Sequence, residues 1–258
     1  METVVFLCEN SIEGILTGVY DAWKEAVSSG LGHGHCKLAV SVEQPELFCT
    51  YREIDAEPDK AEKVIRTLRR RLGEEAYAWL CYAMASCESD KAETVYKTIV
   101  AGLSMEKGFR VFDKVTDPYV ARCFELKRNV GCEIHREVEF LRFRELKNGV
   151  LLAKIHPKND VLMYLGPHFS DRLPLEDFLI YDMNRRKALF HEKQKEWYMM
   201  EALELDGAAA ENISTEEEYY QDLFRMFCRT IAIESRKNKA LQRQFLPLYY
   251  RDLMPEFA

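Results

Sequence analysis

The sequence predicts an α+β protein, with N-terminal strands and a helical segment, then a small, mostly antiparallel sheet with packed helices, and a helical C-terminus. Three observations lead to this prediction. A β-branched, apolar run at residues 3–8 is typical of a buried strand, and apolar residues at helical spacing follow it. Asn148-Gly149 lies between two apolar-rich runs, which is a strong hairpin signal because these residues tolerate positive φ. Three further strands are predicted at 178–181, 189–191 and 197–200.

The N-terminal part alternates between short strands and helices. Ser11 offers an N-cap for a helix whose apolar residues recur every four positions from 15 to 27. Strands are predicted at 37–42 and 47–51, and a helix begins at Pro58. Gly73 breaks this helix and a second one follows. We therefore expect an N-terminal α/β lobe at 1–83 and an α+β domain at 84–258.

A third helix is predicted after Ser89-Asp90, which with Glu93 resembles a capping box, and Gly108 closes it. The helix that begins at Pro58 and ends at Gly73 has a basic face at Arg66 and Arg69–Arg71. This face is either a solvated helix surface or a contact for nucleic acid.

The centre of the chain is predicted to pass from helix to hairpin. Asp117-Pro118 starts a helix, and 129–131 stops it. The stretch 131–145 then forms a strand that enters a type I′ turn at Asn148-Gly149. In that register Lys147 faces Val150, Arg144 faces Ala153 and Arg142 faces Ile155. A helix at 157–173, broken near Gly166-Pro167, follows the hairpin.

Alternation along a strand places Arg142 and Arg144 on one face, roughly 7 Å apart. Two guanidinium groups at this spacing can bind successive phosphates or an acidic partner. They can equally cover apolar surface and pair with Glu137, Glu139 or Glu145.

The net charge of −7 argues against indiscriminate nucleic-acid binding, but its distribution is uneven. Residues 196–222 hold nine acids and no bases, whereas 225–251 hold seven bases and one acid. Either the two blocks neutralise each other, or the basic block forms part of a polyanion site. The basic tail also carries amides and aromatics, which can contact base edges and stack on bases.

Metal, cofactor and membrane signals are weak or absent from the sequence. The eight cysteines contain no C-x-x-C pair, so they are predicted to be reduced, buried thiols. A loop with His33, His35 and Cys36 lacks a second ligand pair, and we predict neither metal nor cofactor. No apolar run approaches 18 residues, and the N-terminus lacks the basic region of a signal peptide, which favours a cytoplasmic protein.

The sequence also resembles a known family. Residues 238–247, following 231–236, resemble the closing signature of a bacterial family of DNA metabolism or repair proteins whose function is unknown. His135-Arg136 with 140–145, and 168–172, resemble its central motifs, and the start of the chain with 14–17 is similar to its N-terminus. The family tail usually reads Asn-Pro-Arg before Leu-Gln-Arg, and Arg-Tyr-Trp after the proline. This chain has Lys239-Ala240 and 249–251 there instead.

Members of that family typically accompany a radical-SAM protein, and a related region is fused to uracil-DNA-glycosylase-like domains in some bacteria. The resemblance therefore implies a role in DNA metabolism, a radical-SAM partner, and single-stranded or damaged DNA as a ligand.

We therefore expect a nucleic-acid-binding or adaptor subunit. One alternative is a base-excision or nucleotide-processing enzyme using His135, His168 and nearby carboxylates, and another is a structural interaction protein. Arg142, Arg144, Arg172 and Arg243 are expected to surround one concave surface. The predicted nucleic-acid-binding residues are His135, Arg136, Arg142, Arg144, His168, Arg172, Arg236, Asn238, Gln242, Arg243, Gln244, Tyr249 and Tyr250.

Overall fold

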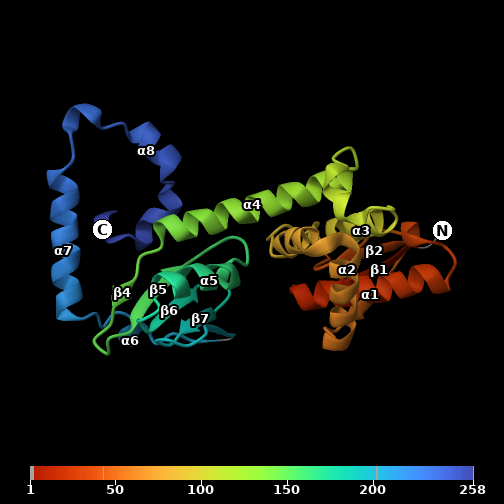
Figure 1. The fold of residues 1–258 in the computed structure, drawn as a ribbon, viewed down its shortest axis with the longest axis horizontal. Coiled ribbons are helices and arrows are strands. Elements are labelled where there is room, and N and C mark those ends of the chain that lie inside the picture. Colours follow the sequence, from red (N-terminus) through yellow and green to blue (C-terminus); the bar gives the residue numbers. More distant parts are fainter. Residues whose placement is uncertain (1–2, 43, 202, 258) are drawn as a thin grey trace. The chain divides into compact units, whose positions relative to one another are not determined.

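A computed structural model describes residues 3–42, 44–201 and 203–257 (Figure 1). The α+β class predicted from the sequence is confirmed, with small sheets, packed helices and a helical C-terminus. Contacts divide the chain into two compact units, Met1–Cys132 (unit 1) and Glu133–Ala258 (unit 2). The predicted domain boundary after residue 83 lies within unit 1, at the end of its longest helix, and the predicted domain limits stay a prediction.

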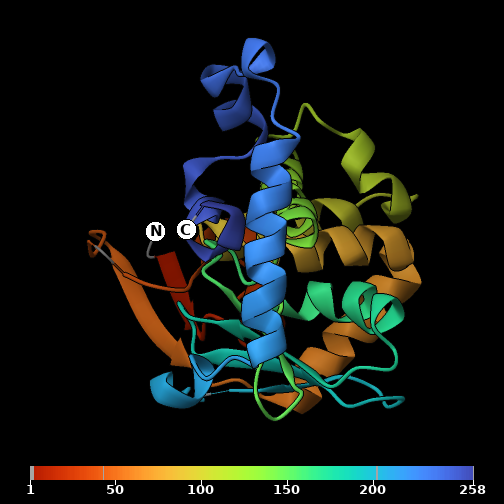
Figure 2. The ribbon, with the colours of Figure 1, turned by 90° about the vertical axis from the view of Figure 1, so that its left-hand side faces the viewer.

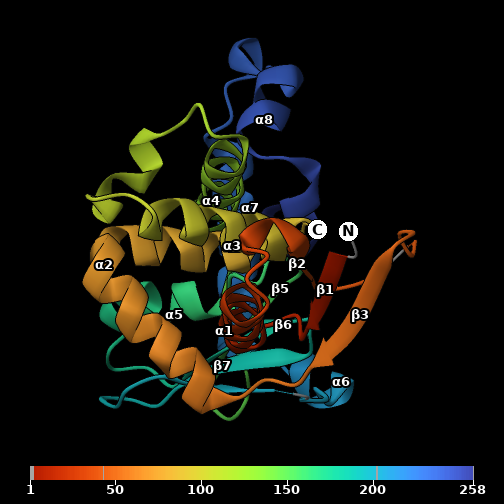
Figure 3. The ribbon, with the colours of Figure 1, turned by 90° about the vertical axis from the view of Figure 1, so that its right-hand side faces the viewer.

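Unit 1 is built on a three-stranded parallel sheet, whose strands appear beside the helices in Figure 3. The central strand β1, Thr3–Cys8, pairs with β2, Cys36–Ala39, and with β3, Cys49–Ile54. The helix α1, Ile12–Ser28, follows β1, and the predicted N-cap is confirmed because the Ser11 side chain accepts a hydrogen bond from the Gly14 amide. Gly18 allows α1 to approach β1, since a Cβ there would lie 2.1 Å from the Cys8 Sγ.

Two further helices contribute to the core of unit 1. They are α2, Pro58–Met84, and α3, Lys91–Leu103, with 3-10 helices at His33–His35 and Gly108–Asp113. The predicted break at Gly73 is confirmed by its φ of 85°. Buried side chains of the sheet and of all three helices form one core, including Phe6, Leu16, Leu68 and Tyr96.

Two local predictions in unit 1 are wrong. Asp90 makes no side-chain capping bond, because its carboxylate accepts from the Arg122 guanidinium at 2.8 Å. The Glu93 carboxylate accepts from the Leu38 amide at 2.8 Å and joins α3 to β2. The helix also ends at Leu103 rather than at Gly108. In the predicted metal-like loop, His33 hydrogen bonds to the Tyr96 hydroxyl, and no metal-binding cluster occurs among the residues that the structure describes.

Unit 2 contains a five-stranded, mostly antiparallel sheet in the order β4-β5-β6-β7-β8. Its strands are β4 Arg144–Glu145, β5 Leu151–Ile155, β6 Phe178–Asp182, β7 Lys187–His191 and β8 Tyr198–Met200. Only the β5–β6 pair is parallel, and the helix α5, Leu162–Arg172, connects these two strands. One face of the sheet packs against α5 and the end of α4, and the other packs against residues 203–210.

The central stretch 131–140 is helical, which corrects the predicted strand. The helix α4 extends over Pro118–Phe140 and passes through Gly131, where a stop was expected. Ile134 and Val138, four residues apart, pack on the core of unit 2. This packing offsets the cost of about 1 kcal/mol for a glycine within a helix.

The hairpin after α4 is confirmed, but its predicted register is wrong by one residue. Arg144 pairs with Leu152, and the Leu146 amide donates to the Val150 carbonyl at 2.9 Å. The loop therefore has three residues, 147–149, and only Gly149 has positive φ, whereas a type I′ turn needs two such residues. Arg142 consequently lies before the strand and not within it.

The helix α5 is also continuous through Gly166-Pro167, where a break was predicted. Gly166 is required for packing, because a Cβ there would lie 2.5 Å from the Trp197 ring. The helix begins at Leu162, so the residues between β5 and α5 form a loop.

The C-terminal segments are helical and follow the sheet (Figure 2). They are α6 Gly207–Ala210, α7 Thr215–Thr230, a 3-10 turn at Glu234–Arg236, α8 Lys239–Phe245, η4 Leu248–Leu253 and η5 Pro255–Phe257. The predicted cap of α7 is confirmed, since the Ser214 side chain accepts from the Glu217 amide at 3.0 Å. None of the helices in the described ranges is both long and apolar enough to cross a bilayer.

Candidate functional site

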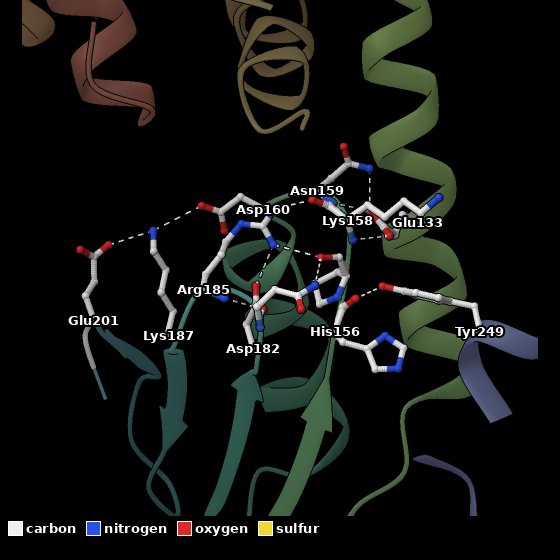
Figure 4. A network of polar contacts seen from close by, with 12 residues as sticks. Glu133, His156, Lys158, Asn159, Asp160, Asp182, Arg185, Lys187, Glu201 and Tyr249 are labelled. Carbon is white, nitrogen blue, oxygen red and sulfur yellow. Dashed lines mark hydrogen bonds and ion pairs between the residues drawn. The ribbon is translucent and has the colours of Figure 1, made fainter. Parts of the chain in front are cut away.

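A cluster of polar side chains collects where the parallel strands β5 and β6 end (Figure 4). Loops that follow the carboxyl ends of parallel strands are frequent positions for ligand sites in α/β sheets. Here the loop after β5 carries 156–160, and the turn after β6 carries Asn184 and Arg185. We call this region the sheet edge.

Asp182 holds the two loops of the sheet edge together. Its carboxylate is fully buried, accepts from the Asn184 amide at 2.9 Å, and pairs with the Arg185 guanidinium at 3.1 Å. Arg185 also donates to the Pro157 carbonyl at 3.1 Å and to the Lys158 carbonyl. Burial raises the pKa of Asp182, and Arg185 opposes that shift.

Glu133 of α4 fixes the loop after β5 from the other side. Its carboxylate accepts from the Lys158 amide at 2.8 Å, and from the Asn159 amide and side-chain nitrogen at 2.8 and 2.6 Å. Because Glu133 is 8% exposed, these bonds replace the water that it loses on folding. The loop is therefore held on α4 by a buried carboxylate.

Glu137 lies one helical turn after Glu133 and carries the largest acid–base perturbation of the sheet edge. Burial, followed by the negative charges of Glu133 and Asp182, raises the pKa of its carboxyl to about 8. A carboxyl with such a pKa can give and take a proton near neutral pH. It lines a narrow pocket of about 10 Å³, together with Arg142, Lys154, His156 and Tyr250.

The C-terminal turn η4 covers this pocket. The Tyr249 hydroxyl donates to the His156 carbonyl, and the two rings lie 4.3 Å apart between centroids. His156 Nε2 lies 3.1 Å from the Asp252 carboxylate. Tyr250 packs on the Phe140 ring at 5.3 Å, and burial raises the pKa of both tyrosines. These contacts hold residues 248–257, which we call the strapped tail, on the sheet edge.

The predicted site residues fall into separate groups. Arg142 contacts the strapped tail, which includes Tyr249 and Tyr250, and its guanidinium pairs with Glu256 at 2.9 Å. Arg136 joins this group, because its guanidinium lowers the pKa of the Tyr250 hydroxyl and opposes the effect of burial. The ion pair of Arg142 is with Glu256 and not with Glu137, Glu139 or Glu145, the partners considered from the sequence.

The other predicted residues lie elsewhere. His135 is exposed on α4 and contacts Glu139 at 3.1 Å, and Arg144 lies in β4. His168 and Arg172 are exposed on α5. The convergence of Arg142, Arg144, Arg172 and Arg243 on one surface stays a prediction. The remaining predicted residues lie on or beside α8, namely Arg236, Asn238, Gln242, Arg243 and Gln244.

The α8 region forms a groove of about 540 Å³, which we call the arm groove. It is lined by three bases, two amides and three apolar side chains, namely Arg236, Lys237, Lys239, Asn238, Gln242, Ala232, Leu241 and Phe245. The Phe245 ring is 71% exposed and Leu241 is 49% exposed. The Asn238 side chain caps α8 by accepting from the Leu241 amide at 3.0 Å, so it also has a structural role.

Three bases of the C-terminal block form no ion pair with described residues, namely Arg236, Lys239 and Arg243. Acids of the acidic block pair with Arg186, Lys187 and Arg225. The pair of Arg225 with Asp222, three residues apart on α7, joins the two blocks locally.

Residues 89–256 match a protein family described as a domain of unknown function, DUF4130. The chain belongs to the DUF4130 family. A search of curated proteins finds no match. The DUF4130 region includes the whole sheet edge and the arm groove, and it begins at the start of α3.

Sequence reasoning missed Asp182, Arg185 and Asn159 as members of the DUF4130 sheet edge. A signal was present, because polar residues follow directly after the apolar strand runs at 151–155 and 178–181. The sequence did not indicate that β5 pairs with β6. This pairing brings the loop after β5 and the turn after β6 together.

Proposed function

We propose that this DUF4130 protein binds single-stranded nucleic acid in the arm groove. The observation that carries the proposal is the combination in one groove of bases, amides and an exposed aromatic ring. Two of these bases, Arg236 and Lys239, form no ion pair with described residues. Arg236 and Lys239 would bind phosphates, and the amide of Gln242 would hydrogen bond to base edges. These are the side-chain types that single-strand-binding proteins combine.

In this proposal, a nucleic-acid base stacks on the ring of Phe245. Its ring is 71% exposed, whereas Tyr250 is 8% exposed and Tyr249 is bonded to His156. A base that stacks on an aromatic side chain gains about 1–3 kcal/mol. The two tyrosines instead hold the tail on the sheet edge, which leaves the groove side of α8 free for a strand.

The family resemblance extends the proposal to DNA metabolism. We propose that the protein acts as an adaptor that brings single-stranded or damaged DNA to a radical-SAM partner in the cytoplasm, where its free cysteines stay reduced. The overall charge of −7 opposes binding of a polyanion to the rest of the surface. Binding by this protein alone is therefore expected to be weak, and tighter with the partner.

Fluorescence anisotropy with a labelled single strand tests the proposal. Affinity should fall as salt rises, with a log–log slope of about −0.7 for each phosphate contact. Arg236→Gln/Lys239→Gln should weaken binding and flatten the slope, because two contacts are lost. Phe245→Ala should weaken binding with little change in slope, since stacking is not ionic.

Lys193→Gln is the matched control, because Lys193 is an exposed base outside the groove whose side chain makes no ion pair with described residues. Its binding should equal that of the unaltered protein. Binding that does not weaken with salt would contradict the proposal. Equal losses of affinity in Lys193→Gln and in Arg236→Gln/Lys239→Gln would also contradict it.

A second function is favoured by Glu137, whose pKa of about 8 suits a general acid or base. We propose base excision or nucleotide processing at the sheet edge as the alternative. The pocket holds no more than one water as folded, so a substrate would enter only after η4 withdraws. The test measures release of uracil from a uracil-containing strand. Release by the unaltered protein that is absent in Glu137→Gln would support this alternative. No release by the unaltered protein with its partner would exclude this substrate.

A further inference from the structure

The three helices of unit 1 enclose a pocket that is separate from every residue of the proposed function. It has a volume of about 710 Å³ and lies between α1, α2 and α3. Val19, Leu68 and Ile99 are buried and supply apolar lining, and Tyr20 and Trp23 add two aromatic rings. This volume lies within the range of about 300–1,000 Å³ that is usual for small-molecule sites.

The charges around this pocket all have one sign. Lys24, Lys63, Arg70 and Arg71 line it, and no acidic residue does. The ion pairs of the described residues include none of these four cations. Lys63 lies 5.8 Å from the centroid of the Tyr20 ring, which places its ammonium group beside the apolar lining.

Neighbouring arginines on the same helix show that this pattern is local. Arg66 pairs with Glu62 at 3.5 Å, and Arg69 pairs with Glu74 at 3.4 Å. Neither of these paired arginines lines the pocket, whereas the unpaired Arg70 and Arg71 do. The predicted basic face of this helix is therefore divided into a neutralised part and a part with unbalanced positive charge.

We propose that this pocket binds a small amphiphilic anion, with its apolar body among the helices and its carboxylate or phosphate group at the cationic rim. An apolar lining favours a ligand that loses water on binding, and a rim without acids favours one negative group. Acyl anions and nucleotides both have this chemistry. The site goes beyond nucleic-acid binding, because the arm groove shares no residue with it.

The test compares two fluorescent probes with similar aromatic bodies. Anilinonaphthalene sulfonate is anionic, and N-phenyl-1-naphthylamine is neutral. The full-length protein should bind the sulfonate with one-to-one stoichiometry and an affinity that falls with salt. Arg70→Gln/Arg71→Gln should weaken sulfonate binding about tenfold, because two rim charges that attract the sulfonate are lost. Its affinity for the neutral probe should not change.

Arg66→Gln/Arg69→Gln is the matched control, since it removes the same charge from the same helix outside the pocket. It should leave both probe affinities unchanged. Equal affinity for the two probes, or equal losses in the two double variants, would overturn the proposal.

Competition then identifies the body of the ligand. Displacement of the sulfonate by dodecanoate would assign an acyl anion, and displacement by adenosine monophosphate would assign a nucleotide. Displacement by neither compound would overturn the proposal.

Discussion

Glu137 shows how burial alters a single side chain in this protein. Its carboxyl lies in a pocket with Tyr250 and faces the carboxylates of Glu133 and Asp182. The three acids differ in the contacts that offset their burial. Glu133 accepts three hydrogen bonds, and Asp182 forms an ion pair with Arg185. Glu137 is therefore the acid that holds a proton at neutral pH, with a pKa of about 8.

Stability should accordingly depend on pH through Glu137. The folded state holds the extra proton between the ordinary pKa of 4.5 and about 8, so the free energy of unfolding falls as pH rises through that window. Glu137→Gln should remove this fall, which amounts to roughly 2–3 kcal/mol between pH 6 and pH 9, at about 1.4 kcal/mol for each pH unit below the pKa of about 8. Urea unfolding at pH 6 and pH 9 measures the free energy of unfolding of both proteins, and Glu139→Gln, at an exposed glutamate, is the control. An unchanged pH dependence in Glu137→Gln would contradict the assignment.

Gly166 gives a second test at the residue scale. A methyl group there would lie 2.5 Å from the Trp197 ring, so Gly166→Ala should lower the free energy of unfolding by about 1–3 kcal/mol. Gly207→Ala is the control, because nothing lies within 4 Å of its Cβ position. Thermal unfolding followed by tryptophan fluorescence compares the two variants, and equal melting temperatures would show that the contact is not close.

At the scale of elements, the C-terminal turns η4 and η5 are held by a few specific contacts. Arg142 pairs with Glu256, which is 11% exposed at its side chain, and Tyr249 bonds to the His156 carbonyl. The tail therefore depends on residues that lie about 100 positions earlier in the chain. These contacts give Arg142 a structural role in addition to the predicted phosphate role.

Arg142→Gln should loosen the tail without unfolding the sheet, because it leaves Glu256 as a buried charge without a partner. Hydrogen exchange at 248–257 should become faster, while exchange in β6 stays slow. Arg144→Gln is the comparison, since Arg144 makes no ion pair with a described residue. Equal rates of hydrogen exchange at 248–257 in the two variants would show that the Arg142–Glu256 ion pair does not hold this segment.

The elements also show which predictions a sequence supports. Ser11, Ser214 and the break at Gly73 were predicted correctly, because capping and positive φ depend on neighbouring residues. Gly131 was misjudged as a stop, because α4 is stabilised by packing on residues far along the chain. The hairpin loop was recognised from Asn148-Gly149, but its length was set by pairing and not by the dipeptide.

The same distinction applies to the candidate sites. The composition of the arm groove is visible in the sequence, because its bases, amides and Phe245 are close together along the chain. The sheet edge is not visible there, since Glu133, Asn159 and Asp182 meet only through tertiary packing. The unit 1 pocket likewise needs three helices to be placed side by side.

At the scale of the whole molecule, the uneven charge is the feature that links fold to proposed function. The protein is acidic overall, yet Arg236, Lys239 and Arg243 around α8 form no ion pair with described residues. A polyanion should therefore be directed to the arm groove and repelled from the acidic surfaces. On the proposed function, this protein would then hold a nucleic-acid strand on α8 while residues 248–257 keep the sheet edge closed.

The most direct test of this account is to locate bound single-stranded DNA by hydrogen exchange. With a saturating oligonucleotide at low salt, protection should increase at 232–245, and it should be lost in Arg236→Gln/Lys239→Gln. Residues 248–257 and the strands of the sheet should exchange as in the free protein. Protection confined to the sheet edge or to α5, or no protection within 232–245, would contradict the arm groove as the binding site.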